Sequence, residues 1–202
     1  GFFGAITALA GKLDAASLAA HQIALTAASI TFMVPLGVSS AGAVRVGQAL
    51  GGGDARRAGI AGWTALLIGT GFMSCGALAF IVAPRAIARA FTPEQGVIEA
   101  AASLLFVAAF FQLFDGVQVV STGILRGTGD TRTPMLCNLF GHWLIGLPVA
   151  YSLCFLLDLG VVGLWLGVSL GLIVVGIVLL IVWSRRVHQL EESVPAFVAP
   201  MH

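Results

Sequence analysis

Five long apolar stretches, separated by short polar connectors, dominate the pattern of hydrophobic and polar positions along the chain. They cover about residues 18–44, 60–83, 97–124, 134–157 and 160–183. A helix rises about 1.5 Å per residue, so each stretch can cross the ~30 Å hydrocarbon core of a bilayer. None of them shows the apolar–polar alternation typical of membrane β-strands. The pattern therefore predicts an all-α fold, a polytopic membrane helix bundle.

Two shorter segments flank these spans. Residues 1–11 are apolar but too short to cross a bilayer, and we interpret them as the end of a truncated membrane helix. On this interpretation the chain is a C-terminal piece of a longer protein. Residues 12–186 then hold five full transmembrane helices. Residues 187–202, with two prolines and an acidic pair, predict a disordered cytoplasmic tail.

Composition agrees with a membrane protein and excludes several other classes. The 202 residues are 58% hydrophobic and only 9% charged, whereas a soluble domain carries about 25% charged residues. The mean hydropathy is +1.01. The net charge of +1 says nothing about partners, but no basic cluster is suited to nucleic acid, so no nucleic-acid partner is expected. The bilayer itself is the expected surrounding.

The few basic residues are distributed unequally between the two sides that alternating spans define. One side collects seven arginines and the other only three basic residues; the two sets are Arg45, Arg56, Arg57, Arg126, Arg132, Arg185 and Arg186 against Lys12, Arg85 and Arg89. Short cytoplasmic loops are enriched in Lys and Arg. The asymmetry predicts that the arginine-rich side and the C-terminus are cytoplasmic.

The third span contains the sharpest chemical signal, a carboxylate in an otherwise apolar helix. Asp115 is the only charged residue between positions 100 and 125, and it lies eleven residues before Arg126. That spacing is roughly 16 Å along a helix, so Asp115 lies near the bilayer midplane. A carboxylate there is costly and usually faces a bundle interior or a water-filled cavity. At 100° per residue, Gln112, Gln118 and Thr122 share its face.

Two interpretations of Asp115 follow from this placement. It binds Na⁺ or H⁺ in a transport pathway, or it is a hydrogen-bonded side chain that only fastens helices together. We favour the ion site, because one charge in five spans is costly to retain for packing alone. Gln112, Gln118 and Thr122 are then pathway candidates, together with Asn138 and Gln22 in other spans. Interhelical hydrogen bonding is the ordinary role of such polar groups.

Other residues in and between the spans predict local structure. Pro35 and Pro148 kink their helices, either as bending points of a moving transporter or as static kinks. Gly163, Gly167 and Gly171 form a small-residue stripe typical of close helix packing. A Thr92-x-x-Gln95 capping box predicts the start of the third span, and Thr133 a cap for the fourth.

The connector after the third span carries a loop motif of four residues, Arg126, Gly127, Asp130 and Arg132. It resembles the connector after the first span, where Gly53-Asp54-x-Arg56 follows Arg45-x-Gly47. An internal repeat would produce this echo, and so would chance, because glycine turns and cytoplasmic arginines are common.

The sequence gives no support for an enzyme. Residues 167–171 match a G-x-S-x-G pattern, but a nucleophile elbow needs a strand–turn–helix context that a membrane helix lacks. No cofactor is expected beyond the coupling ion.

Several separated segments, in order, are similar to the multidrug and toxin extrusion (MATE) family. They are AAHQIA from Ala19, FMVPLGVSSAGAVRVGQALG from Phe32, FDGVQVVSTGILRGTGDTRTP from Phe114 and WLIGLPVAY from Trp143. The resemblance implies one six-helix lobe of a two-lobe transporter, from the end of the seventh helix through the twelfth. It also implies an N-terminal lobe as partner and a plasma membrane location, the inner membrane in bacteria.

The activity that this resemblance implies is antiport, in which amphipathic and often cationic drugs leave as Na⁺ or H⁺ enters. Asp115 matches the acidic residue of the family's tenth helix. A lipid-linked precursor flippase of the same superfamily is an alternative, although no Lys or Arg lies mid-span. A non-functional truncated half-transporter is another.

Overall fold

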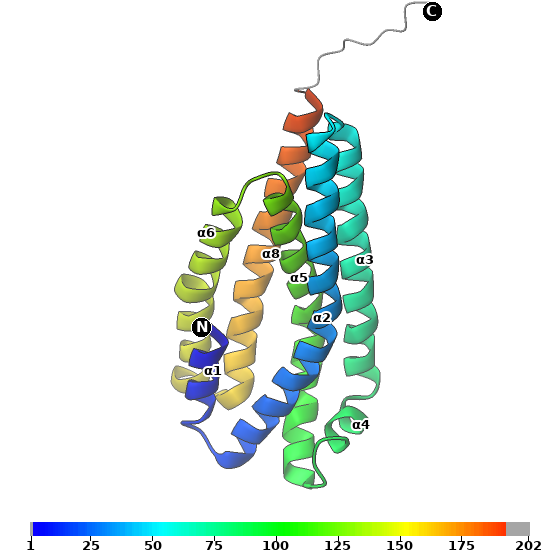
Figure 1. The fold of residues 1–202 in the computed structure, drawn as a ribbon. Helices are drawn as coiled ribbons and strands as arrows, with labels where there is room; N and C mark the ends of the chain where they lie inside the picture. The colour runs from blue at the N-terminus through cyan, green and yellow to red at the C-terminus, as the bar shows by residue number, and fades with distance from the viewer. Residues whose placement is uncertain (1, 193–202) are drawn as a thin grey trace, which may run out of the picture.

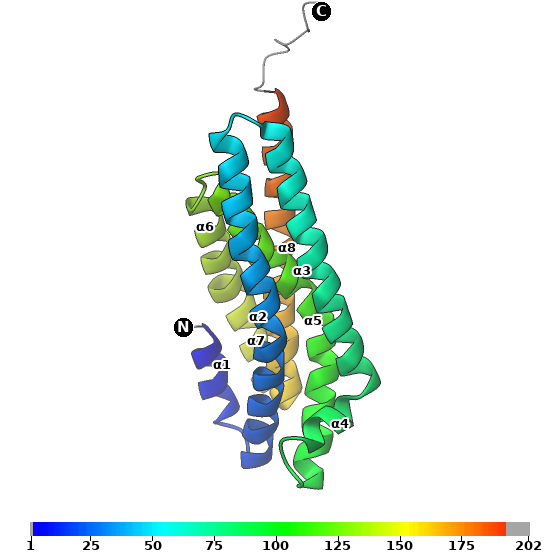
Figure 2. The same ribbon diagram turned by 45° about the vertical axis from the view of Figure 1, so that its right-hand side comes forward.

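The computed structural model describes the backbone of residues 2–192 and the side chains of residues 4–192, and it is a bundle of long helices (Figures 1 and 2). The helices are α1 (Phe2–Ala10), α2 (Ala15–Gly51), α3 (Ala55–Val82), α4 (Pro84–Arg89), α5 (Gln95–Gly127) and α8 (Gly160–Glu192). The segment between α5 and α8 forms one continuous rod, which we call the α6–α7 rod. It consists of α6 (Arg132–Phe140), the π-helix η1 (Gly141–Gly146), α7 (Leu147–Tyr151) and the π-helix η2 (Ser152–Leu156). Five segments are long and apolar enough to cross a membrane, and no strand occurs within residues 2–192. The predicted all-α membrane bundle is confirmed.

The long α5 is the central helix, and its neighbours α2, α3 and α8 all pack along it. In Figure 1, α2 and α3 lie on one side of the bundle and the α6–α7 rod on the other. The α2–α3 connector, the α5–α6 connector and the end of α8 all lie at the top of that view. The seven arginines counted from the sequence therefore gather at one end of the bundle, which we call the arginine-rich end.

Two predicted helix starts are wrong. The third span begins at Gln95 with Glu94 in the cap position, and the Thr92 hydroxyl instead accepts the Glu94 N–H at 3.2 Å. Thr92 thus closes a local turn after α4, as Ser and Thr often do. The fourth span begins at Arg132, one residue before the expected Thr133 cap.

The two connectors that resemble each other in sequence also share a backbone construction. Gly53 and Gly129 have φ values of +77° and +84°, in the left-handed region that favours glycine. Each is followed by an aspartate that accepts the N–H three residues ahead, Asp54 from Arg57 at 2.8 Å and Asp130 from Thr133 at 3.0 Å. This similarity is what an internal repeat would produce.

In the α5–α6 connector, the hydrogen bond from Thr133 also affects the pKa of Asp130. Partial burial by itself would raise the pKa of the Asp130 carboxyl. The hydrogen bonds from Thr133 and the charge of Arg186 outweigh that effect, so the pKa lies below its ordinary value. Asp130 is therefore an ionised cap at the start of α6.

The last helix is longer than the sequence predicted. It continues as far as Glu192, so residues 187–192 are helical and not part of a disordered tail. Val187 explains the extension, because its buried side chain packs over Gly59 of α3 and joins the core around Trp183. Residues 193–202 of the predicted tail lie outside the described residues.

The two interior prolines occupy different settings. Pro35 is buried in the middle of α2, where its missing N–H leaves the Thr31 carbonyl without its helical donor. Figure 1 shows that α2 changes direction in its blue lower half. Pro148 is the second residue of α7, which separates the π-helices η1 and η2, so the fourth span is irregular on both sides of it.

Small residues allow the helix backbones to approach closely. A Cβ atom on Gly163 would lie 2.7 Å from the carbonyl carbon of Leu153, and one on Gly171 would lie 3.0 Å from the Cα of Gly146. A Cβ on Gly167 would collide with the Ala150 backbone. The predicted packing role of this glycine stripe is confirmed, and its partner is the α6–α7 rod.

We predict that Gly167→Leu destabilises the bundle by about 3 kcal/mol, because a leucine cannot fit against the Ala150 backbone without moving a helix. Its neighbour Leu166 is 40% exposed, so Leu166→Ala should change the stability by less than about 0.5 kcal/mol. Thermal unfolding of both variants in the same detergent measures the difference. Equal melting temperatures would contradict the packing role.

Candidate ion site at the centre of the bundle

The apolar core is divided into two clusters along the bundle axis. On α5 the first cluster ends at Phe111 and the second, nearer the arginine-rich end, begins at Val120. On α8 the corresponding change falls between Leu172 and Val175. Polar side chains lie between the two apolar clusters and at the border of the second one. They are Gln112, Asp115, Gln118 and Thr122 of α5 and Asn138 of α6. We call these five residues the polar belt.

Asp115 is the charged member of the polar belt. Its side chain is half-buried, and it forms no hydrogen bond or ion pair with another described residue. On the helical wheel it lies between Gln112, which faces α2 and α3, and Gln118, which bonds to α6. The carboxylate therefore occupies the strip of α5 that runs between these two contacts.

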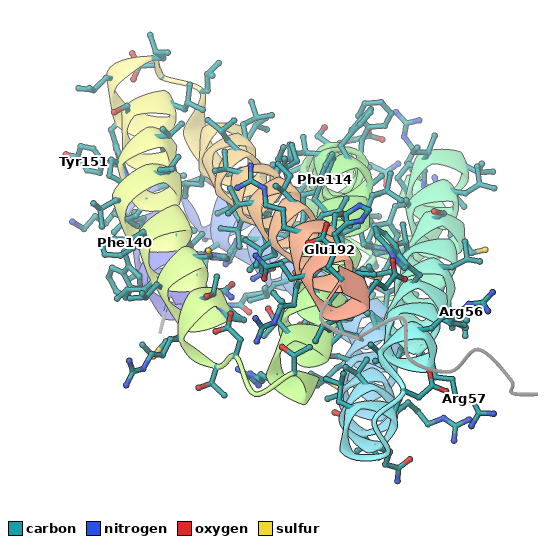
Figure 3. The ribbon with its side chains drawn as sticks, turned by 90° about the horizontal axis from the view of Figure 1, so that it is seen from above. Arg56, Arg57, Phe114, Phe140, Tyr151 and Glu192 are labelled. Carbon is teal, nitrogen blue, oxygen red and sulfur yellow. The ribbon has the colours of Figure 1, made fainter. Side chains whose placement is uncertain are left out.

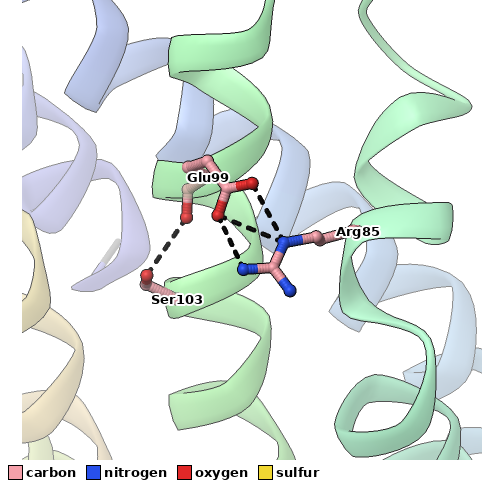
Figure 4. A network of polar contacts seen from close by, with 3 residues as sticks. All are labelled: Arg85, Glu99 and Ser103. Carbon is pink, nitrogen blue, oxygen red and sulfur yellow. Dashed lines mark hydrogen bonds and ion pairs between the residues drawn. The ribbon is translucent and has the colours of Figure 1, made fainter.

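The other carboxylate of α5 has the opposite character. Glu99 is exposed near the start of the helix, and Arg85 of α4 binds it through Nε at 2.9 Å and Nη2 at 3.0 Å (Figure 4). The Ser103 hydroxyl donates to the Glu99 carbonyl at 3.1 Å. The acid at the membrane boundary has a cationic partner within the bundle, and the acid at its centre does not.

Gln112 lies one turn before Asp115 and is fully buried. Neither its amide nitrogen nor its amide oxygen has a hydrogen-bond partner in the described residues. The amide nitrogen packs against Gly76 of α3, which the Thr31 methyl group of α2 also approaches. The Thr31 carbonyl lacks its helical donor because of Pro35. An unmade hydrogen bond on a buried group costs about 1–3 kcal/mol. The centre of the bundle thus concentrates polar groups that the helices themselves leave unsatisfied.

Gln118, Thr122 and Asn138 form an interhelical network in place of an open site. Gln118 Nε2 donates to Asn138 Oδ1, and Asn138 Nδ2 donates to the Pro134 carbonyl at 2.7 Å and weakly to Thr122 Oγ1 at 3.5 Å. His142 Nδ1 lies 3.0 Å from the Asn138 carbonyl oxygen. These polar groups connect α5 to α6, which is the ordinary role expected of them.

His21 makes a second interhelical network, with partners that the sequence did not indicate. The Trp165 indole can only donate, so its 3.1 Å contact makes His21 Nδ1 the acceptor. His21 Nε2 then carries the proton and donates to Thr7 Oγ1 at 3.0 Å. These bonds hold α1, α2 and α8 together. No local signal connects His21 with Trp165, because 144 residues separate them.

The remaining candidates lie apart from the polar belt. Gln22 is exposed on α2, nine residues or about 13 Å along the axis from Thr31. Ser169 lies within α8 and donates to the Trp165 carbonyl at 2.7 Å, as a helical serine does and a nucleophile elbow does not. Within residues 4–192, no group of three His, Cys, Asp or Glu side chains is arranged to hold a metal ion.

Comparisons with known proteins agree with this architecture. The family model described as MatE matches residues 1–152. The chain is 46% identical over 189 residues to the probable multidrug resistance protein NorM of Mesorhizobium japonicum, covering 91% of this chain and 40% of that protein. It is also 46% identical over 191 residues to the multidrug resistance protein NorM of Burkholderia vietnamiensis, covering 92% of the chain and 40% of the relative.

Solved structures show the same fold. The eukaryotic MATE transporter AtDTX14 superposes with a TM-score of 0.84 at 25% identity, covering 95% of this chain and 44% of that one. A MATE in its straight conformation has a TM-score of 0.87 at 18% identity, with 95% and 43% covered. The chain thus spans about two fifths of the length of the relatives it matches. It is an integral membrane protein that belongs to the MATE family, the family of the multidrug and toxin extrusion transporters.

Proposed function

We infer that this chain is the ion-binding part of a MATE-type antiporter that exports amphipathic, often cationic, drugs in exchange for Na⁺ or H⁺. The relatives in Mesorhizobium and Burkholderia are named as multidrug resistance proteins, which supports efflux as the activity. The coupling ion binds at Asp115, and the second lobe of the transporter completes the substrate cavity. The membrane is the plasma membrane, which in bacteria is the inner membrane.

The observation that carries this proposal is the state of Asp115. It is a half-buried carboxylate at the centre of the bundle, without a cationic or hydrogen-bonding partner among the described residues. An Asp retained to fasten helices would engage a neighbour, as Gln118 does with Asn138. A carboxylate left open at mid-membrane is suited to exchange its partner, because Na⁺ or H⁺ can occupy it and leave again.

Gln112 supports the same role. Residues three apart on a helix are neighbours, so Gln112, whose amide has no partner among the described residues, shares a face of α5 with Asp115. Hard cations prefer oxygen ligands, and the Gln112 amide oxygen and the Thr31 carbonyl can supply them or hold a hydrating water. In this proposal Gln118, Thr122 and Asn138 form the wall of the pathway.

The energy source and the moving parts follow from the same elements. A cation that enters down a membrane potential releases about 2.3 kcal/mol per elementary charge and 100 mV, which can drive export. Pro35 and the π-helical segments around Pro148 are the proposed bending points, because both interrupt the regular helical hydrogen bonds. Ion occupancy at Asp115 would bias the bending of the adjacent α2.

We predict that Asp115→Asn abolishes ion-driven export while leaving expression and folding largely intact. Asparagine keeps the shape of the side chain but removes the charge and the titration. Uptake of a fluorescent cationic drug into inverted membrane vesicles, with an imposed Na⁺ or H⁺ gradient, measures the effect. The protein should be expressed from its complete gene and compared at matched amounts.

The matched control is Glu99→Gln, which removes the exposed carboxylate of the same helix and leaves Asp115 untouched. Gradient-driven export by this control should stay close to that of the parent. Undiminished gradient-driven export by Asp115→Asn would eliminate the coupling role and leave Asp115 a structural residue.

We also predict that the arginine-rich end is cytoplasmic, because seven of ten basic residues gather there. In a background without native cysteines, Thr131→Cys lies at the arginine-rich end and Glu94→Cys at the opposite end, both at exposed positions. A membrane-impermeant maleimide added to intact cells should label the cysteine at 94 only. Labelling of the cysteine at 131 without permeabilisation would contradict the orientation.

A further inference from the structure

A groove between α2 and α3 at the arginine-rich end has no part in the ion site. Its volume is about 780 Å³, and residues of both helices line it, namely Val38, Ala41, Gly42, Arg45, Gln48 and Ala49 of α2 with Arg57, Ile60, Ala61, Thr64, Ala65 and Ile68 of α3. The volume is that of a small-molecule site, which typically measures about 300–1,000 Å³. Small residues form its floor, where the α2 backbone at Gly42 comes close to Ala65.

Three of the four polar side chains that line the groove gather at one end, and the fourth, Thr64, lies further along α3. Arg45, Gln48 and Arg57 lie toward the connector, and none of the twelve lining residues is acidic. Within the described part of the chain, Arg45 has no hydrogen bond or ion pair, and it is exposed. Arg57 contacts Asp54 through Nε at 3.4 Å, but 81% of its side chain is exposed. This end therefore presents two exposed guanidinium groups and one carboxylate, that of Asp54 beside Arg57, and so carries a net positive charge.

Apart from Thr64, the rest of the groove is apolar and open. Ile60 and Ile68 are 57% and 55% exposed, although both line it. From Arg57 to Ile68 the groove extends eleven residues along α3, about 16 Å. Half of a ~30 Å hydrocarbon core is about 15 Å, so the groove as a whole is about as deep as one leaflet, and its apolar part from Ile60 to Ile68 covers about 12 Å of that depth.

We propose that this groove binds one anionic diacyl phospholipid, with the phosphate between Arg45 and Arg57 and an acyl chain along the apolar wall. Charge complementarity selects the headgroup, since guanidinium groups match phosphate oxygens in geometry and charge. A free phosphate would leave the apolar wall of the groove uncovered, whereas the acyl chain of a membrane lipid can lie along it. Basic pockets between transmembrane helices on the cytoplasmic side are known to bind acidic lipid headgroups.

Arg56 provides an internal control, because it is adjacent in sequence to Arg57 but does not line the groove. Figure 3 views the bundle from the arginine-rich end and shows both side chains at the α3 edge, with Arg57 nearer the cyan end of α2. Val44 is a similar control for the apolar wall, since it is exposed on α2 next to the groove but outside its lining.

The test is lipid binding by the protein expressed from its complete gene, delipidated in a neutral detergent. Dioleoyl phosphatidylglycerol, dioleoyl phosphatidylcholine and inorganic phosphate are titrated separately, with adducts counted by native mass spectrometry and melting temperatures measured in parallel. Phosphatidylglycerol should bind and stabilise the protein, and the other two should not. The readout involves no transport, so it is independent of the coupling role proposed for Asp115.

The variants then locate the bound lipid. Arg45→Gln with Arg57→Gln should weaken phosphatidylglycerol binding about 30-fold, about fivefold for each arginine. Ala41→Phe should also weaken it by filling the groove. Arg56→Gln and Val44→Phe should change it by less than about twofold.

Several outcomes would overturn the proposal. Unchanged phosphatidylglycerol binding by the double arginine variant would place the lipid elsewhere, and equal binding of phosphatidylcholine would remove the headgroup recognition. Stabilisation by inorganic phosphate alone would indicate an anion site without a lipid. No bound lipid in the parent would indicate that another part of the protein covers the groove.

Discussion

The bundle depends on the close approach of α2 and α5. In a bilayer the lipid tails are as apolar as the side chains, so helices associate through packing and hydrogen bonds. A Cβ on Gly127 would lie 3.0 Å from the Val46 Cβ and would collide with the Ala43 carbonyl oxygen, and Gly123 faces Ser39 just as closely. Because the backbones meet, the Ser39 hydroxyl reaches across to the Val119 carbonyl at 2.7 Å. This contact anchors the helix with the polar belt to the helix with the buried proline.

The polar belt makes the centre of the bundle chemically different from the apolar regions on either side of it. Above and below the polar belt, apolar clusters fill the space between the helices. At the belt itself, Pro35 leaves the Thr31 carbonyl of α2 without its helical donor, and the Gln112 amide is buried without a partner among the described residues. Asp115 lies one turn further along α5. A static bundle would gain stability by pairing these groups with one another or by replacing them with apolar residues. Their retention favours a site whose partner comes and goes.

The polar groups of the spans fall into three physical classes. Many serine and threonine hydroxyls, such as those of Thr26 and Ser29, donate to carbonyls of their own helix and need no neighbour. Gln118 and His21 are satisfied between helices and fix how those helices pack. A third class has no hydrogen-bond partner among the described residues. It includes Gln112, Asp115 and Ser121 of α5 and the indole N–H of Trp183. Gln112 and Asp115 belong to the proposed cation site, and the unpaired Arg45 belongs to the proposed lipid site.

Local sequence determined the broad features of this protein. Composition and helical rise were enough to locate five membrane spans, to collect the arginines at one end and to place Asp115 well inside the third span. Each of these features depends on residues close together in the chain. Helix ends were less certain, since Thr92 and Thr133 suit several local turns and α8 is extended by a contact of Val187 with α3. The tertiary structure alone decided which polar groups stay open. Gln112 and Gln118 look equivalent in the sequence, because both lie on one face of the same helix. In the structure Gln118 donates to Asn138, whereas the Gln112 amide has no partner among the described residues. Packing of distant segments decides this difference, and spacing along the chain does not show it.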